Sequence, residues 1–385
     1  MASLGLEKRL LSSLRPRLPE VLDTLRKLTL LESPSLEKPL LDRCCDFLAD
    51  LWLGRGSLVH VLKQSVRGNH LRAVWPSSPS RRRGQLLILG HYDTVYPAGT
   101  LQHMPFRRAG PKVFGPGTFD MKAGIVQALF ALEALQQLRI PARKNLVFLW
   151  TSDEETGSAA SRRLIETEAR QSDAVLVLEP ALGPQGLLKT SRKGVGEVHL
   201  IVRGHASHAG LAPERGVNAI HELARQIARI EGWNDHRRGV SVHANLIQGG
   251  TRTNVTADYA EARVDLRAWK QADMRSLERR MHALKPIHKG ARLELRGGFN
   301  RPPLERRHSS ALFACAQRIA KQLGFRLGEA AAGGGSDGNF TAALGIPTLD
   351  GLGAVGDGAH SPDEYVLVQA MPQRAALLAA LLATC

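Results

Sequence analysis

The chain has 385 residues, a length that predicts two domains rather than one compact core. Hydrophobic residues make up 43% of it and charged residues 23%, a globular balance that excludes wholesale disorder. The net charge of +16 makes nucleic acid a partner to consider. However, no basic run is longer than Arg81-Arg82-Arg83, and only 5% of residues are aromatic. A single-strand binder would interleave aromatic side chains with its basic groove. We therefore interpret the charge as a solvated surface and expect no nucleic-acid partner.

The cysteines and the N-terminal segment bear on the compartment. Cys44, Cys45, Cys315 and Cys385 form no CxxC pair, which excludes a zinc ribbon, and the adjacent pair lies in an apolar stretch typical of a buried helix. Charged residues occur throughout the N-terminal segment, which leaves no room for the apolar region of a signal peptide. No apolar run approaches the roughly 20 residues that span a bilayer. We expect a cytoplasmic protein without a membrane partner.

Taken in chain order, the first half alternates helical and strand patterns. Leucines at helical spacing open the chain over residues 4–28. Such alternation predicts a parallel sheet covered by helices on both faces, with a ligand site beyond the carboxyl ends of the strands. The expected strands are 85–90, 145–151 and 173–178, and the expected helices are 122–138 and a segment after Ser158.

From about residue 193 the pattern changes to a β-α-β-β-α-β order, which is typical of a ferredoxin-like α+β domain. The α/β pattern then returns with a helix over 309–323 and another that closes the chain. We therefore expect a discontinuous domain of residues 1–192 and 303–385, interrupted by an inserted domain of residues 193–302. The expected elements of the insert are strands at 194–204, 241–248, 258–268 and 292–296 and helices at 217–230 and 274–284.

Acidic residues and histidines follow the places where apolar strands end. They are His91 and Asp93, Asp120, the pair Glu154-Glu155, Glu179, and His360 with Asp363 and Glu364 close behind it. A single such residue is usually a cap or a satisfied loop residue. Together, at the carboxyl edge of one sheet, they predict a metal site, because imidazoles mixed with carboxylates suit zinc or a similar divalent ion.

Charge counting favours two ions. Two divalent ions bring four positive charges, which a bridging Asp120, one terminal carboxylate on each ion (Glu155 and Glu179) and a bridging hydroxide neutralise. His91 and His360 complete the two ligand sets. Paired ions about 3.5–4 Å apart share and acidify a water and clamp the carbonyl oxygen that it attacks.

The remaining carboxylates have other roles in this scheme. Glu154 stands beside a ligand and is left to take the proton of the water as general base. Asp93 lies two residues past His91, where it can accept the second N–H of the imidazole and fix its tautomer.

Short motifs follow one another between about residues 85 and 365. They are Gly90-His91-Tyr92-Asp93-Thr94-Val95, Gly115-Pro116-Gly117 with Asp120-Met121-Lys122, Asp153-Glu154-Glu155-Thr156-Gly157-Ser158, Leu178-Glu179-Pro180, Gly204-His205-Ala206-Ser207-His208-Ala209-Gly210, Gly333-Gly334-Gly335-Ser336-Asp337 and Gly358-Ala359-His360-Ser361. The set resembles the M20 family of metallopeptidases, the aminoacylase and carboxypeptidase clan. The resemblance implies a three-layer αβα catalytic domain with two Zn²⁺ per subunit, Co²⁺ or Mn²⁺ being alternatives. It also implies an inserted lid that forms a homodimer interface.

The resemblance assigns roles residue by residue. His91, Asp120 and Glu179 would hold one metal, and Asp120, Glu155 and His360 the other. Glu154 would be the general base and Asp93 the orienting acid, and the Asp120-Met121 peptide bond would be cis.

The resemblance also assigns roles in the insert. His208 matches a lid histidine that donates to the developing oxyanion in a neighbouring subunit's site, whereas His205 receives no role. Asn254, Arg267 and Arg301 match positions tied to substrate contact, and an arginine fork suits a substrate carboxylate. The loop that contains Gly334 and Gly335 is either a backbone nest for a carboxylate or a flexible segment.

Within the family, the motifs Gly298-Phe299-Asn300-Arg301-Pro302-Pro303 and Gly333-Gly334-Gly335-Ser336-Asp337-Gly338-Asn339 most resemble those of the glutamate carboxypeptidase branch. Leu187 stands where some of these enzymes have a lysine for the glutamate side chain, and Ala123 stands where the family often has glycine. The leading hypothesis is a dizinc hydrolase that cuts an amide bond next to a free carboxylate and releases a C-terminal amino acid, with glutamate as candidate. The alternatives are an N-acyl amino acid deacylase of the acetylornithine or succinyl-diaminopimelate type and, from another class, a basic nucleic-acid-binding protein.

Overall fold

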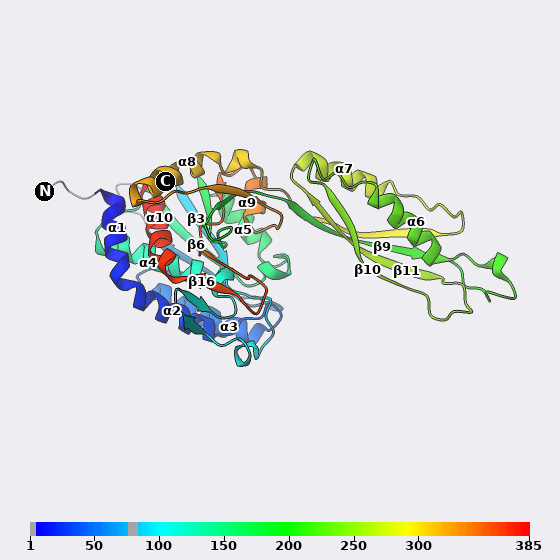
Figure 1. The fold of residues 1–385 in the computed structure, drawn as a ribbon, viewed down its shortest axis with the longest axis horizontal. Coiled ribbons are helices and arrows are strands. Elements are labelled where there is room, and N and C mark those ends of the chain that lie inside the picture. Colours follow the sequence, from blue (N-terminus) through cyan, green and yellow to red (C-terminus); the bar gives the residue numbers. More distant parts are fainter. Residues whose placement is uncertain (1–4, 76–83) are drawn as a thin grey trace. The chain divides into compact units, whose positions relative to one another are not determined.

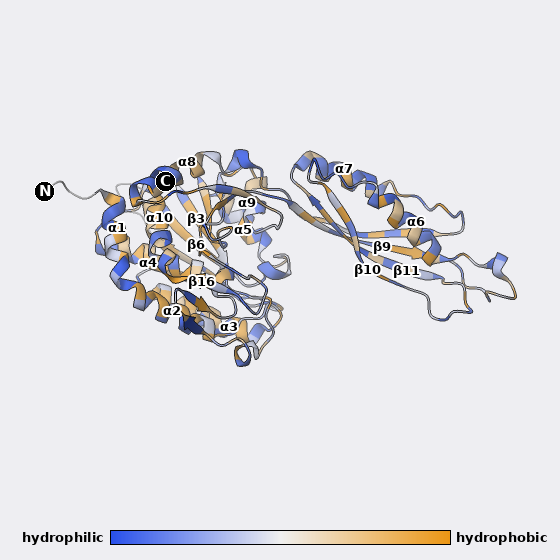
Figure 2. Cartoon of the chain, in the orientation of Figure 1, coloured by the Kyte–Doolittle hydropathy of each residue, from blue (hydrophilic) through white to orange (hydrophobic). Residues whose placement is uncertain are grey.

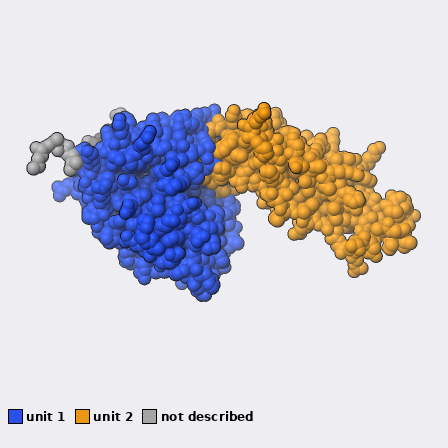
Figure 3. Space-filling view, in the orientation of Figure 1, with its two compact units in different colours: residues 1–191, 306–332, 336–385 blue, residues 192–305, 333–335 orange. Residues whose placement is uncertain are grey.

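The chain divides into two compact units, one inserted in the other (Figures 1 and 3). The computed structural model describes residues 5–75 and 84–385, so the Arg81-Arg82-Arg83 run lies outside the described residues. Unit 1 comprises Met1–Ser191, Arg306–Ala332 and Ser336–Cys385, and unit 2 comprises Arg192–Glu305 and Gly333–Gly335.

Unit 1 is built on a six-stranded mixed sheet with the strand order β1-β2-β6-β3-β7-β14. β6, β3, β7 and β14 run parallel, which confirms the predicted arrangement for this part of the sheet. β1 and β2 form an antiparallel hairpin that pairs with β6 through β2. The sequence pattern does not reveal the hairpin, because β1 is largely exposed and lacks the continuous apolar run of a buried strand. The strands are β1 (Leu58–Leu62), β2 (His70–Trp75), β3 (Gln85–His91), β6 (Asn145–Thr151), β7 (Ala174–Val177) and β14 (Thr348–Leu349).

Helices cover both faces of this sheet. Successive residues of a strand face opposite layers, so Leu86 and Ile88 belong to one apolar core and Leu87 and Leu89 to the other. The first core holds α1, α2, α3, α4, α8 and α10, and the second holds α5 and α9. The three-layer α/β architecture is thereby confirmed, and the apolar strands and α10 stand out in Figure 2. The helices are α1 (Leu6–Leu14), α2 (Leu18–Leu30), α3 (Lys38–Leu53), α4 (Ala123–Gln137), α5 (Arg162–Arg170), α8 (Ser310–Leu323), α9 (Gly338–Ala343) and α10 (Met371–Thr384).

A smaller four-stranded sheet with the order β15-β16-β5-β4 positions two of the predicted site residues. β5 leads into the segment that carries Asp120, and the loop between β15 and β16 carries His360. Because β16 pairs with β5, these two parts of the chain are held side by side. The strands are β4 (Arg107–Ala109), β5 (Lys112–Phe114), β15 (Gly356–Asp357) and β16 (Tyr365–Leu367), and a separate pair is formed by β8 (Leu188–Arg192) and β13 (Glu329–Ala332).

Unit 2 is a four-stranded antiparallel sheet with the order β10-β11-β9-β12, and two helices, α6 and α7, pack on one face. The chain order is β-α-β-β-α-β, as the sequence predicts. The last strand runs five residues beyond the expected 292–296 and passes through Gly297, which adopts φ +89 and where an added Cβ would lie 2.3 Å from the carbonyl oxygen of Glu197. The elements are β9 (Gly194–Arg203), α6 (Ala219–Glu231), β10 (Ser241–Gly249), β11 (Tyr259–Ala268), α7 (Gln271–His282) and β12 (Arg292–Arg301).

All four cysteines are present as thiols. Cys44 and Cys45 are buried in α3, in agreement with the helix expected there. Sγ of Cys315 in α8 lies 3.9 Å from Sγ of Cys385. Among the helices of the described residues, none has the length and apolar character required to cross a membrane.

Candidate metal centre

Two overlapping clusters of imidazoles and carboxylates lie at the carboxyl edge of the sheet in unit 1. One consists of His91, Asp120 and Glu179, and the other of Asp120, Glu155 and His360. Within each cluster the candidate ligand atoms all lie within 4.8 Å of one another. Asp120 is common to both clusters. The structure thus brings together the five residues that the sequence singles out as metal ligands.

The two carboxylate oxygens of Asp120 face different histidines. Its Oδ1 lies 3.3 Å from Nε2 of His91, and its Oδ2 lies 3.5 Å from Nε2 of His360. Each histidine also faces a second carboxylate. Nε2 of His91 lies 3.4 Å from Oε1 of Glu179, and Nε2 of His360 lies 3.2 Å from Oε1 of Glu155. This geometry fits a carboxylate that bridges two cations, each with one histidine and one further carboxylate.

His91 closes β3 and is almost fully buried, at 1% exposure. Its Nδ1 lies 3.0 Å from the carbonyl oxygen of Asp93 and 3.4 Å from the Asp93 carboxylate. Both ring nitrogens face acceptors, but Nδ1 has the nearer one, so in the neutral ring it carries the proton and Nε2 is left to face the clustered carboxylates as a ligand atom. The carbonyl of Asp93 is therefore a closer partner of the imidazole than the carboxylate that the sequence suggests.

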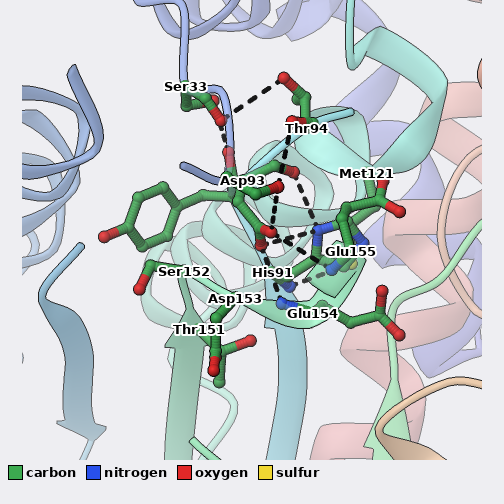
Figure 4. Close-up of polar contacts among 12 residues, drawn as sticks. Ser33, His91, Asp93, Thr94, Met121, Thr151, Ser152, Asp153, Glu154 and Glu155 are labelled. Atoms are coloured by element: carbon green, nitrogen blue, oxygen red, sulfur yellow. Dashed lines mark hydrogen bonds and ion pairs between the residues drawn. The ribbon is translucent and has the colours of Figure 1, made fainter. Parts of the chain in front are cut away.

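The Asp93 carboxylate is fully buried and holds the turn that carries the acidic pair. Its oxygens accept the backbone N–H groups of Glu154 and Glu155, each at 3.2 Å, and the hydroxyl of Ser35 donates to it at 2.8 Å. Figure 4 shows His91, Asp93 and Glu155 together, with the Glu154 side chain extending away from them. The sequence does not predict the role of Ser35, because a serine in a loop shows no pattern that indicates contact with a distant aspartate.

The loop that carries Asp120 is held by the buried carboxylate of Glu364. This carboxylate accepts the backbone N–H groups of Gly117, Phe119 and Asp120 at 2.9, 2.7 and 2.9 Å. Burial raises the pKa of Glu364 to about 7. The Asp120-Met121 peptide bond is cis, as the resemblance implies. The sequence shows Glu364 as an acid close behind His360 but gives no sign that it binds this loop.

The donor set fits divalent cations. Oδ1 of Asp120 is buried and, within the described part of the chain, receives no hydrogen bond. Asp120 and Glu155 raise the pKa of His360 to about 10. Burial lowers the pKa of His91, but the surrounding carboxylates, Asp120 first, outweigh it and hold that pKa well above the usual range. The clustered carboxylates therefore favour positive charge at the two points where metal ions would be coordinated.

The residues that the resemblance ties to substrate belong to unit 2, whereas the acidic clusters belong to unit 1. His208 is exposed, and its Nδ1 accepts the backbone N–H groups of Gly210 and Leu211 at 3.2 and 3.1 Å. In the neutral ring the proton is therefore on Nε2, which makes that nitrogen a hydrogen-bond donor. Asn254 lies beside the same loop, since its carbonyl oxygen accepts the N–H of Ala209 at 3.0 Å.

The arginines of unit 2 are engaged with their neighbours. Arg267 donates to both carboxylate oxygens of Asp265 at 3.0–3.1 Å and to the carbonyl oxygen of Gly333 at 3.1 Å. Arg192 donates to the carbonyl oxygens of Gly334 and Gly335 at 3.2 and 3.1 Å. The glycine loop is thus held through its carbonyl groups by two guanidinium groups.

Arg301, the third substrate candidate in unit 2, is buried at 8% exposure and closes β12. A Cβ added at Gly335 would lie 3.0 Å from Cδ of Arg301. The glycine therefore permits the close approach of the loop to this arginine.

The family model described as "Peptidase family M20/M25/M40" matches residues 87–384. The chain belongs to this family. Carboxypeptidase G2 from Pseudomonas sp. (strain RS-16) is 33% identical over 304 residues, which are 77% of this chain and 73% of that protein. Family and relative together show a hydrolytic enzyme of the metallo-carboxypeptidase and amidohydrolase class.

Two further similarities are to a second curated relative and to a solved structure. Succinyl-diaminopimelate desuccinylase from Leptothrix cholodnii is 27% identical over 346 residues, 85% of this chain and 90% of that protein. The YxeP protein of Bacillus subtilis, described as a dinuclear metal-binding peptidase of the M20 family, matches with a TM-score of 0.70 at 15% identity, over 96% of this chain and 98% of that chain. The structural match supports the fold.

Two positions of this M20 enzyme depart from the pattern expected of its family. Leu187, in place of a lysine, has its Cδ2 2.6 Å from a Cβ built at Gly328, so it packs against that part of unit 1. Ala123 is fully buried at the start of α4. The first departure removes the lysine that the resemblance associates with a glutamate side chain, and the second lies in α4, outside the two clusters.

Proposed function

We propose that this M20 enzyme cleaves an amide bond next to a free carboxylate and releases a C-terminal amino acid, with glutamate as the first candidate. The observation that carries the proposal is the Asp120 carboxylate, whose two oxygens face two separate pairs of one histidine and one glutamate. Similarity to a relative named Carboxypeptidase G2 supports release of a C-terminal residue.

In this proposal His91, Glu179 and Asp120 hold one Zn²⁺, and Asp120, Glu155 and His360 hold the second, with Co²⁺ or Mn²⁺ as substitutes. Two bound divalent ions would supply the Lewis acidity that activates a water and polarises the substrate carbonyl. Asp93 keeps the Nδ1 proton of His91 in place through its carbonyl and carboxylate oxygens.

Glu154 is the proposed general base. It adjoins Glu155 in the turn Glu154–Thr156, and its backbone N–H is fixed by Asp93. The side chain would take a proton from the attacking water and deliver it to the amine that leaves. Glu154 shares this turn with the proposed ligand Glu155. The hydrogen bonds that the Asp93 carboxylate accepts therefore fix the backbone positions of both residues.

Unit 2 supplies the remaining parts of the proposal, as a lid that also forms a homodimer. The Nε2 donor of His208 would stabilise the oxyanion in the partner subunit's site. Arg267 and Arg301 would bind the substrate carboxylate, which for Arg267 means exchange of its present contact with Asp265. Asn254, Gly334 and Gly335 would complete the substrate contacts.

A second candidate activity is removal of an N-acyl group from an amino acid, of the acetylornithine or succinyl-diaminopimelate type. It is favoured by the similarity to a succinyl-diaminopimelate desuccinylase over 90% of that protein's length. Both activities would use the same metal ligands and the same base, so the acyl group of the substrate separates them.

A substrate panel tests the proposal. The protein, freed of metal and reloaded with Zn²⁺, is assayed on dipeptides with C-terminal glutamate, folyl-type α- and γ-glutamates, N-acetyl amino acids and N-succinyl-diaminopimelate. Highest kcat/KM on a C-terminal glutamate substrate supports the first candidate. Highest kcat/KM on the N-acetyl or N-succinyl substrates selects the second, and no hydrolysis of any of them refutes both.

A further inference from the structure

Two of the four cysteines face each other where helix α10 ends beside helix α8. Cys315 lies in α8, and Cys385 directly follows the last residue of α10. Their Sγ atoms are 3.9 Å apart, close to van der Waals contact, although 70 residues of chain separate them. Both side chains are partly exposed, so a small solute can reach them. Figure 1 shows the C-terminal end of the chain beside α8.

Cys315 has the surroundings of a nucleophilic thiolate. The S–H of Cys385 donates to its sulfur, and so does the guanidinium group of Arg318, at 3.5 Å and one helical turn further along α8. These two hydrogen bonds, that of Cys385 first, outweigh the effect of burial and lower the pKa of Cys315 to about 6. At pH 7 about nine-tenths of Cys315 is therefore thiolate, whereas an ordinary cysteine, with a pKa near 8.5, is thiolate to about 3%.

Cys385 has the complementary character. Its hydrogen bond to Cys315, together with burial, holds the pKa of Cys385 well above the usual range, so it remains a thiol. A thiolate in contact with a second thiol is the arrangement in which the first sulfur reacts with an oxidant and the second then displaces the oxygen. Because Cys385 lies beyond the last residue of α10, its side chain can turn toward Cys315 without a change in that helix.

The other two cysteines differ in every one of these respects. Cys44 and Cys45 are adjacent residues of α3, and both are fully buried. Burial raises the pKa of Cys44 to about 11 and that of Cys45 to about 12. Buried thiols of this kind are inert toward a dissolved oxidant. They serve as an internal control for the reactivity of Cys315 and Cys385.

The helix that ends before Cys385 also holds the backbone around a proposed metal ligand. The buried guanidinium group of Arg374, in α10, donates to the carbonyl oxygens of Gly353 and Gly186 at 2.9 and 3.2 Å. The N–H of Gly353 in turn donates to the carbonyl oxygen of Glu179 at 2.9 Å. A covalent link at the end of α10 would therefore fasten a helix on which this backbone depends. The cysteines are not among the candidate ligands, so such a link leaves the ligands unmodified.

We propose that Cys315 and Cys385 form a peroxide-reactive dithiol, which closes an intrachain disulfide that fastens the end of α10 to α8. The Cys315 thiolate attacks one oxygen of a hydroperoxide such as hydrogen peroxide, and the O–O bond breaks. The sulfur gives two electrons to the peroxide and becomes a sulfenic acid, and hydroxide leaves. Sγ of Cys385 then attacks the Cys315 sulfur, so that the S–S bond forms and the S–O bond breaks. The leaving hydroxide takes the Cys385 proton and departs as water, and a thiol reductant reverses the link.

Treatment of the full chain with a small excess of hydrogen peroxide at pH 7 tests the proposal, whether or not the protein hydrolyses any substrate. The free thiols of the wild type, counted after unfolding, should fall from four to two. Peptide mapping without reductant should show the Cys315 peptide joined to the Cys385 peptide, and dithiothreitol should restore all four thiols. Four thiols that persist, a disulfide between two chains, or a disulfide that includes Cys44 or Cys45 would overturn the assignment.

Serine variants separate the roles of the two sulfurs. In Cys385→Ser the sulfenic acid of Cys315 has no partner thiol, so its labelling by dimedone during oxidation should exceed that of the wild type about tenfold. In Cys315→Ser the nucleophile is missing, and the remaining thiols should persist. Equal labelling of Cys315 in the wild type and in Cys385→Ser would overturn the pairing, as would loss of thiols from Cys315→Ser at the wild-type rate.

The link should also stabilise unit 1, because it joins residues that are 70 positions apart in the unfolded chain. The midpoint of thermal unfolding should be about 5 °C higher in the oxidised wild type than in the reduced wild type, and dithiothreitol should remove the difference. Peroxide-treated Cys315→Ser is the matched control and should show no shift. A verified disulfide that leaves the midpoint unchanged would overturn the fastening of α10.

Discussion

Glu364 binds the backbone of Asp120, the residue shared by both clusters of candidate metal ligands. Its Oε1 accepts the N–H of Asp120 at 2.9 Å and that of Phe119 at 2.7 Å, while Oε2 accepts the N–H of Gly117 at 2.9 Å. A buried acid with no place among the candidate ligands thus sets the direction of the carboxylate on which both clusters depend.

Replacement of this acid should weaken metal binding. Glu364→Ala leaves three backbone N–H groups without their acceptor, so the free energy of unfolding should fall by about 2 kcal/mol or more. Metal affinity should fall about 10- to 100-fold, the usual effect of losing a group that orients a ligand. Both are measured by denaturant titration and by competition with a chelator. Asp363→Ala, at the exposed neighbouring position, is the control and should change neither.

Substitution of the proposed base and substitution of a proposed ligand should lower activity for different reasons. Glu154→Gln keeps the shape of the side chain but removes the proton acceptor, so kcat should fall by about 10²–10⁴ while metal content stays near that of the wild type. Asp120→Ala removes the shared ligand and should lose metal. Elemental analysis of both proteins alongside kinetics makes the comparison. Unchanged kcat in Glu154→Gln would show that another group accepts the proton.

Turnover should depend on metal. A strong chelator should abolish activity, and zinc, cobalt or manganese should restore it, since both proposed ion sites depend on deprotonated carboxylates and neutral imidazoles. The metal content is followed by elemental analysis at each step. Full activity in protein shown to be free of metal would contradict the mechanism.

The candidate ligands could be found from the sequence for a geometric reason. His91, Glu155 and Glu179 each lie at or just after the end of an apolar strand, and the carboxyl ends of parallel strands meet at one edge of the sheet. Ser35 and Glu364 could not be found in this way. They act on Asp93 and Asp120 across 58 and 244 residues of chain, through a hydroxyl and through backbone N–H groups that leave no mark on composition.

The fold, too, has parts that the sequence predicts and parts that it does not. The strands with a continuous apolar run and the β-α-β-β-α-β order of unit 2 follow from the periodicity of apolar residues. The β1–β2 hairpin and the small sheet β15-β16-β5-β4 do not, because their strands are short or largely exposed and depend on pairing with distant segments. That small sheet nevertheless holds the loops of Asp120 and His360 together, so part of the site depends on the least predictable strands.

The cysteines should differ sharply in reactivity. The hydrogen bond from Cys385 lowers the pKa of Cys315 to about 6, whereas burial raises that of Cys44 to about 11. Cys315 is also partly exposed and Cys44 is not. Brief treatment with iodoacetamide at pH 7 should alkylate Cys315 first, because the thiolate is the reacting form. Peptide mapping by mass spectrometry makes the comparison, and labelling of Cys44 at an equal rate would contradict it.

The proposed role of His208 as a lid histidine gives the most demanding test. Nδ1 of His208 accepts hydrogen bonds from two backbone N–H groups, so Nε2 is the donor in the neutral ring. His208→Ala should therefore remove the proposed hydrogen bond to the oxyanion. The expected loss is roughly 2.7–4 kcal/mol of transition-state stabilisation, or about 10²–10³ in kcat, with metal content unchanged. His221→Ala, at an exposed histidine of α6, is the matched control and should remain active.

Mixing subunits shows whether His208 acts across a dimer. His208→Ala and Glu154→Gln should each be nearly inactive alone. If His208 serves the partner's site, a mixed dimer has one site with an intact base and an intact histidine, and activity should return in proportion to the mixed species. If His208 served its own subunit, both sites of the mixed dimer would lack one group and would stay inactive. Mixed dimers verified by mass spectrometry that regain no activity would therefore contradict action in trans, as would a monomer with full activity.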